Sequence, residues 1–221
     1  MDLGRPARTR EIALYRFVRV LIYGVALLFG RIKIIGKEHI PNDGPFILAP
    51  VHRSNIDFAL VSLVTKRRMR YMGKDSIFKH KFLNPFFFAL GAFPVHRGAA
   101  DREALRTSIT VIESGQPLVM FPEGTRQSGP EIQELFDGTA YVAAKTKTPI
   151  VPLGIGGSER AMPKGSKFIH PGKIVLIIGE PLDPPAATES GSTSRRAVKQ
   201  LTDQLKAEIQ KLFDDAQVRA Q

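Results

Sequence analysis

The sequence predicts an α/β protein, a single-domain αβ sandwich with helices packed on a mixed sheet. Short apolar runs of strand length alternate along the chain with longer segments of helical periodicity. Turn residues separate these segments, as in Pro41-Asn42-Asp43-Gly44-Pro45. The length of 221 residues suits one domain with a substantial core. Strands that alternate with helices in this way favour a layered α/β architecture.

The order of the elements follows from these runs. Strands are expected at residues 31–35, 46–49, 70–72, 92–96, 117–121, 150–155 and 173–178. Helices are expected at about residues 10–29, 55–65, 101–114, 131–146 and 193–215. The second helix has a start signal, because Ser54-x-x-Asp57 precedes an apolar run and resembles a helix cap followed by an acidic first turn.

Three parts are expected along the chain. Residues 1–30 form an amphipathic N-terminal helix, residues 31–180 form the core, and residues 181–221 hold a proline-rich link and a C-terminal amphipathic helix. The last helix repeats apolar residues on one face, which favours packing on the core: Val198, Leu201, Leu205, Ile209 and Leu212.

The absence of cysteine excludes disulfides, thiolate metal sites and a cysteine nucleophile. His39, His80 and His170 show no metal-like spacing with carboxylates, so no metal is expected.

The formal charge of +11 is concentrated in two patches. Residues 1–37 hold eight basic and two acidic side chains, and residues 66–81 hold seven basic and one acidic. Basic patches attract nucleic acid, anionic membranes and phosphorylated ligands alike. Here aliphatic and phenylalanine residues accompany both patches. The alternation of aromatic and basic residues that is typical of proteins that bind single-stranded nucleic acid does not occur. An anionic membrane surface is therefore the expected partner, and nucleic acid is not.

The first helix is too short in its apolar part to span a bilayer. The run Val20 to Phe29 extends roughly 15 Å, against a hydrocarbon core of about 30 Å. Arg16, Arg19 and Tyr23 recur at helical spacing and form a narrow polar stripe. We expect an interfacial helix in the headgroup region, with its arginines turned to phosphates. The alternative is an amphipathic helix that packs on the domain.

His52 and Asp57 form the most informative pair in the chain. An imidazole five residues before a carboxylate suits a general base with its own orienting anion. Residues five apart on a continuous helix point about 140° from each other, so the two side chains meet only if the chain turns between them. Ser54 offers that turn. The alternative is a capping role for Asp57 beside an ordinary loop histidine.

Three further clusters follow predicted strands. They are Gly91–Gly98, with Arg97 in its loop; the turn Phe121-Pro122-Glu123-Gly124-Thr125-Arg126; and Ile150–Ile155, with Pro152 inside it. Together with the histidine motif, they resemble the four sequence blocks of the glycerolipid acyltransferases, the PlsC-like lysophosphatidic acid acyltransferase family. The resemblance extends from about Gly36 to Gly157, more than half of the chain.

The resemblance implies an O-acyltransferase of phospholipid biosynthesis. It implies transfer of a fatty acyl group from acyl-CoA or acyl carrier protein to the sn-2 hydroxyl of 1-acylglycerol-3-phosphate, with no cofactor beyond that co-substrate. The expected location is the cytoplasmic face of the cell membrane, as a peripheral or monotopic protein. One alternative is acylation of glycerol-3-phosphate or another lysophospholipid. Another is a non-catalytic basic protein that binds membrane or nucleic acid.

Roles for single residues follow from the resemblance and from their chemistry. His52 is expected to be the general base and Asp57 its orienting partner. The Gly124 amide is the expected oxyanion donor. Substrate contacts are expected from Lys74, Arg97, Glu123, Gly124, Thr125 and Arg126, with the arginines on phosphate.

Two assignments remain open at the level of sequence. Glu123 binds a glycerol hydroxyl or locks its loop by pairing with an arginine. The phenylalanine-rich segment Phe82–Phe93 is core or lines an acyl tunnel. Asn84, within that segment, stands where the family usually has glycine, which weakens the assignment of Lys74.

Overall fold

We describe the protein from a computed structural model. The structure describes residue 5 and residues 7–29, 31–79, 82–95, 102–163, 165–185 and 194–221, apart from the side chains of Phe29 and Lys74. Within this part of the chain, seven strands form one sheet in the order β1-β7-β6-β2-β5-β3-β4. The strands are β1 (Ile32–Ile35), β2 (Ile47–Pro50), β3 (Arg70–Lys74), β4 (Ala92–Val95), β5 (Leu118–Val119), β6 (Ile150–Gly156) and β7 (Ile174–Ile178).

The sheet is mixed, as predicted. Five neighbouring strands, β6, β2, β5, β3 and β4, run parallel to one another. β7 runs antiparallel to β6 and parallel to β1. The loops that follow the five parallel strands therefore leave the sheet at one edge, which we call the C-terminal edge. In open α/β sheets this edge is where ligands bind.

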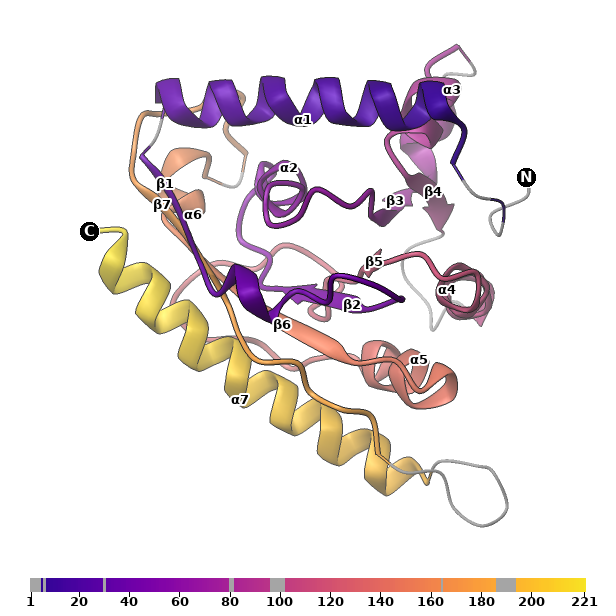
Figure 1. Cartoon of the computed structure of the whole chain (residues 1–221). Coiled ribbons are helices and arrows are strands. Elements are labelled where there is room, and N and C mark those ends of the chain that lie inside the picture. Colours follow the sequence, from indigo (N-terminus) through magenta and orange to yellow (C-terminus); the bar gives the residue numbers. More distant parts are fainter. Residues whose placement is uncertain are drawn as a thin grey trace.

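Helices cover both faces of the sheet (Figure 1). One layer holds α1 (Thr9–Phe29), α2 (Asp57–Val61) and α3 (Asn84–Ala89). The other holds α4 (Arg102–Glu113), α5 (Gly138–Thr146) and the long α7 (Arg195–Arg219). The short elements are η1 (Lys37–His39), η2 (Asp75–Lys79) and α6 (Ser158–Ala161).

The C-terminal helix α7 packs closely along β6. A Cβ atom at Gly156 would lie 2.1 Å from the carbonyl oxygen of Ala216, so only glycine permits this approach. The predicted apolar stripe is buried as far as Ile209, but Leu212 is only partly buried and Phe213 takes the fully buried place. The stripe shifts because a straight helix of 3.6 residues per turn drifts from a fixed spacing of residues.

Two predicted helices have wrong boundaries. The helix expected from residue 131 begins at Gly138, because the segment before it bonds elsewhere: the Ile132 N–H donates to Gln210 Oε1 at 2.8 Å, and the Phe136 N–H donates to Pro122 O at 3.0 Å. The helix expected over 55–65 is α2, which begins at Asp57 and ends at Val61.

The N-terminal helix α1 turns an apolar face outward. Tyr15 and Ala26 are buried against the protein, whereas seven large apolar residues are exposed: Phe17, Val20, Leu21, Tyr23, Val25, Leu27 and Leu28. The Arg19 guanidinium points inward, with Nε donating to Ser62 O at 3.0 Å and Nη2 to Leu63 O at 3.3 Å. The expectation that Arg19 faces lipid phosphates is therefore wrong, because it satisfies carbonyls at the end of α2. In the described part of the chain, no helix combines the length and apolar character needed to cross a membrane.

Candidate active site

His52 and Asp57 meet at the C-terminal edge of the sheet, as the sequence predicts. His52 follows β2, and its Nδ1 lies 3.0 Å from Asp57 Oδ2. Asp57 is fully buried at the first position of α2, and the His52 ring packs against Phe121 at a tilt of 32°, with 4.2 Å between ring centroids. Of the four residues between them, Ser54, Asn55 and Ile56 are in bend or turn conformation, which gives the chain the reversal that a continuous helix could not provide.

The Asp57 carboxylate orients the turn as well as the imidazole. Its Oδ2 accepts the N–H of Arg53 at 2.7 Å and that of Ser54 at 2.6 Å. This is the acidic half of a capping box. The other half is missing, because α2 has Ile56 as its N-cap and the Ser54 hydroxyl donates to Met162 O at 2.7 Å. Ser54 therefore ties two loops together and does not cap the helix.

The hydrogen bonding fixes the tautomer of a neutral His52. An ionised carboxylate only accepts hydrogen bonds, so Nδ1 carries the proton that bonds to Asp57. The lone pair of the ring then lies on Nε2. A histidine held in this way can take a proton from a hydroxyl at Nε2, and the carboxylate stabilises the imidazolium that forms.

A buried ion pair holds the His52 backbone. Glu123 Oε2 accepts the His52 N–H at 3.0 Å, while Arg53 Nη1 donates to His52 O at 3.2 Å. Arg53 Nη1 also lies 2.8 and 2.9 Å from the two Glu123 oxygens, and both side chains are almost completely buried. Two roles were expected for Glu123, and these contacts correspond to the second, pairing with an arginine.

Arg53 reaches beyond this pair to other parts of the chain. Its Nε donates to Gly129 O at 3.2 Å and its Nη2 to Glu131 O at 2.9 Å. Its guanidinium lies 5.0 Å from the centre of the Phe213 ring in α7. The sequence reasoning missed Arg53. The sequence does hold a feature that points to Arg53. It is a basic residue next to the histidine, between an apolar strand and an apolar helix, where a buried charge needs a partner.

Gly124 forms a tight turn after β5. Its φ is +68°, and a Cβ atom there would lie 2.7 Å from Phe136 Cε2, so the turn requires glycine. The Gly124 N–H donates to Phe121 O at 3.0 Å. The predicted role of this amide as an oxyanion donor does not fit the conformation, because its hydrogen already has an acceptor.

Arg126 carries an unsatisfied cationic group next to this turn. Its Nη1 is buried and has no hydrogen-bond partner among the described residues. Thr125 is exposed, and its Oγ1 accepts a 3.2 Å hydrogen bond from Gln127 Nε2. The Gln127 N–H in turn donates to His52 O at 2.9 Å, which places the turn beside the histidine. Lys74 ends β3, but its side chain is not described, and Arg97 lies outside the described residues.

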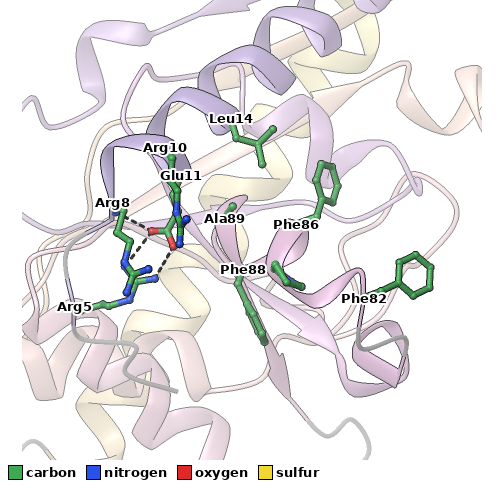
Figure 2. Close-up of a pocket in the computed structure, with 10 residues that line it drawn as sticks. Arg5, Arg8, Arg10, Glu11, Leu14, Phe82, Phe86, Phe88 and Ala89 are labelled. Carbon is green, nitrogen blue, oxygen red and sulfur yellow. Dashed lines mark hydrogen bonds and ion pairs between the residues drawn. The ribbon is translucent and has the colours of Figure 1, made fainter.

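A groove of about 700 Å³ lies apart from this edge, between the start of α1 and α3 (Figure 2). At one end Arg5 and the Arg8 backbone bond to Glu11, and at the other Phe82 and Phe86 are exposed. Phe93 is fully buried, so the phenylalanine-rich segment divides between core and surface. Among the described residues, none from the loops that carry His52 and Glu123 lines this groove, so it is separate from the His52 site.

Comparisons with known proteins agree with this architecture. The sequence model of the family described as Acyltransferase matches residues 31–156. A 1-acyl-sn-glycerol-3-phosphate acyltransferase of Bacillus subtilis is 31% identical over 170 residues, which cover 76% of this chain and 82% of the relative. One from Streptococcus pneumoniae is 26% identical over 207 residues, covering 91% and 74%. The crystal structure of the 1-acyl-sn-glycerophosphate (LPA) acyltransferase PlsC of Thermotoga maritima matches with a TM-score of 0.78 and 26% identity, covering 97% of this chain and 84% of that chain.

The fold and the match of residues 31–156 to the Acyltransferase model define the class of the protein as an acyltransferase. The chain belongs to the PlsC-like family of 1-acylglycerol-3-phosphate acyltransferases, which confirms the resemblance found in its sequence.

Proposed function

We propose that the protein transfers a fatty acyl group from a thioester, acyl-CoA or acyl carrier protein, to the sn-2 hydroxyl of 1-acylglycerol-3-phosphate. The product is phosphatidic acid. The observation that carries this proposal is the 3.0 Å contact between His52 Nδ1 and Asp57 Oδ2, which leaves Nε2 as the basic nitrogen. The names of the relatives support the acceptor, because each is a 1-acyl-sn-glycerol-3-phosphate acyltransferase.

His52 acts as the general base in this reaction. Nε2 removes the proton of the acceptor hydroxyl while its oxygen attacks the thioester carbonyl. The C–O bond forms, the C–S bond breaks, and the imidazolium returns the proton to the departing thiolate. Asp57 stabilises the imidazolium between these steps. A thioester already has a good leaving group, so no covalent enzyme intermediate is required.

Cationic groups hold the acceptor phosphate. Arg126 supports this role, because its buried Nη1 has no partner in the described part of the chain and a guanidinium matches the geometry of phosphate oxygens. Lys74 and Arg97 are proposed to assist from the neighbouring β3 and the loop after β4. Thr125 is exposed on the same turn as Arg126 and is proposed to contact the substrate there.

A membrane surface supplies the acceptor. The outward face of α1 supports this, because seven large apolar residues are exposed on it while the Arg19 guanidinium is turned inward. Exposed apolar residues beside basic ones favour binding in the headgroup region of an anionic leaflet. We propose that the protein associates peripherally with the cytoplasmic face of the cell membrane.

The experiment that tests this function is an acyl-transfer assay with purified protein. Both acyl donors are offered with a panel of acceptors: 1-acylglycerol-3-phosphate, glycerol-3-phosphate and lysophospholipids with other head groups. We expect the fastest transfer to 1-acylglycerol-3-phosphate, at the sn-2 hydroxyl. Faster transfer to another acceptor would replace that substrate assignment. Vesicle binding without transfer to any acceptor would show a non-catalytic membrane protein.

A further inference from the structure

We propose that the loop between α6 and β7, described at residues 163 and 165–172, is a second lipid contact that inserts Phe168 and Ile169 into the leaflet beside the catalytic edge. We call it the 163–172 loop. The inference deepens the proposed function, on which it rests for the presence of a membrane, and it assigns this loop a role separate from that of α1.

The loop presents apolar side chains to solvent at its tip. Phe168 is 76% exposed and Ile169 is 38% exposed. Adjacent apolar residues at this exposure are costly in water unless a partner covers them. The backbone around them is held by hydrogen bonds. Ser166 Oγ donates to Phe168 O at 2.9 Å and accepts the Phe168 N–H at 3.1 Å, and the Ser166 N–H donates to Pro163 O at 3.0 Å.

The charge around the tip suits an anionic surface. Lys167 and Lys173 are exposed on either side of the two apolar residues, and Arg31 is exposed on the neighbouring strand end. Residues 162–173 contain no acidic residue. Lysine and arginine within a Debye length of an anionic leaflet each contribute attraction, and the apolar residues between them can enter the acyl region.

The loop lies near the C-terminal end of α1. β1 and β7 are parallel, with Ile32 opposite Ile174, and the Ile174 N–H donates to Arg31 O at 3.3 Å. The chain that enters β7 therefore lies beside the residues that follow the end of α1. In Figure 1 both segments lie at the same end of the molecule. Leu28, which is 82% exposed, is in the last turn of α1 at this end.

The loop is also tied to the catalytic motif. It follows β6 and the short helix α6, and the C-terminal end of β6 lies at the same edge as the end of β2. Just before the loop, Met162 O accepts the Ser54 hydroxyl at 2.7 Å. A leaflet that contacts both α1 and the 163–172 loop would therefore lie against the edge that carries His52. A lysophospholipid in that leaflet has its free hydroxyl at headgroup depth, the depth at which the motif could meet it.

A fluorescence experiment tests the contact directly. The chain contains no tryptophan, so Phe168→Trp introduces a single reporter. Tyr141→Trp is the matched control, because Tyr141 is an aromatic residue 43% exposed on α5, in the layer opposite α1. With vesicles of phosphatidylglycerol and phosphatidylethanolamine, we expect a blue shift and quenching by brominated acyl chains for Phe168→Trp alone. Val20→Trp reports on α1 in the same assay.

A binding and activity measurement accompanies it. We expect the double variant Phe168→Ser/Ile169→Ser to lose roughly tenfold in vesicle affinity and in turnover of bilayer-presented acceptor, with Tyr141→Ser unchanged. Turnover of a short-chain, monomeric 1-acylglycerol-3-phosphate should stay within about twofold of wild type, because the catalytic edge is intact.

The outcomes separate this proposal from the proposed function. A Phe168→Trp emission that vesicles leave unchanged overturns the proposal, whether or not Val20→Trp responds. The proposal is also overturned if the double variant keeps its vesicle affinity and loses turnover only with acyl carrier protein as donor. That result would assign the loop to binding of the carrier protein. If no acceptor is acylated but Phe168→Trp inserts, the lipid contact stands and the proposed acyl transfer fails.

Discussion

Glu123 Oε2 accepts the backbone N–H of His52 at 3.0 Å, across 71 residues of sequence. The carboxylate of the Glu-Gly-Thr-Arg turn therefore helps to place the histidine. Its charge is matched by Arg53, which bonds both Glu123 oxygens and the His52 carbonyl. His52, the proposed general base, is thus held at its side chain by Asp57 and at its backbone by this ion pair.

Removal of Arg53 should destabilise the fold. Arg53→Met leaves the Glu123 charge buried without its partner, and we expect a loss of about 3–5 kcal/mol in the free energy of unfolding, measured with urea. Arg53→Met/Glu123→Leu should lose less than the sum of the two single variants, because no charge remains buried. The exposed Lys199–Asp203 pair is the control, and Lys199→Met should cause no measurable loss. A loss of unfolding free energy in the double variant equal to the sum of the two single losses would contradict this coupling.

Asp57→Asn should lower kcat while leaving KM for the acceptor nearly unchanged. The amide keeps the size of the carboxylate, but it cannot stabilise the imidazolium or enforce the tautomer with Nε2 basic. We expect a fall in kcat of roughly 10²–10⁴-fold, by analogy with the aspartate of serine-protease triads. Asp183→Asn, at an exposed position in the link before α7, is the control and should be unaffected. A change of KM alone would place Asp57 in substrate binding instead.

Arg126→Met should raise KM for the phosphate-bearing acceptor by roughly tenfold or more, since a charge-assisted hydrogen bond contributes about 1.5–3 kcal/mol. The measurement compares 1-acylglycerol-3-phosphate with 1-acylglycerol, which lacks the phosphate. We expect the preference of the wild type for phosphate to shrink in the variant. Arg106→Met, on the exposed side of α4, is the control. An equal loss with both acceptors would assign Arg126 to the structure of the turn.

Burial of the Arg70 guanidinium should lower the free energy of unfolding at neutral pH. The side chain is 4% exposed, and its Nε and Nη2 lack partners among the described residues. Burial, with repulsion from Arg68 and Arg5, lowers the pKa of Arg70 from 12.5 to about 10. At pH 7 Arg70 is protonated in both the folded and the unfolded protein, but only the folded protein bears the cost of removing this charge from water. Arg70→Met should therefore raise the free energy of unfolding by about 1–2 kcal/mol.

The pH dependence of that gain has a defined sign. Above pH 10 the folded wild type releases the Arg70 proton before the unfolded chain does, so the wild type gains stability as pH rises. The advantage of Arg70→Met should shrink between pH 9 and pH 11, measured by urea unfolding with Arg106→Met as control. A constant difference across this range would show that the charge of Arg70 is not responsible.

Local features of the site were predictable from the sequence. The His52–Asp57 contact forms within six residues, where turn chemistry and helix geometry limit how the chain can run. The C-terminal edge follows from parallel strands, since each loop after a strand in β2, β5, β3 and β4 leaves at the same edge.

Contacts between distant segments were not predictable in the same way. Arg53 and Glu123 lie 70 residues apart, and their pairing depends on the register of β2 and β5, which pairs Leu48 with Val119. The inward direction of Arg19 depends on where α2 ends, which the sequence placed at residue 65 and the structure places at Val61. The Gly124 N–H donates to Phe121 O because of the exact turn type, which glycine alone does not specify.

The most direct test of the account is acyl transfer by His52→Ala. The variant removes the base and leaves the Arg53–Glu123 pair in place, so circular dichroism and urea unfolding should show a folded protein. With a thioester donor and 1-acylglycerol-3-phosphate, we predict a fall in kcat of at least roughly 10³-fold. A folded His52→Ala protein that transfers the acyl group at a rate near that of the wild type would contradict the assignment of His52 as the general base.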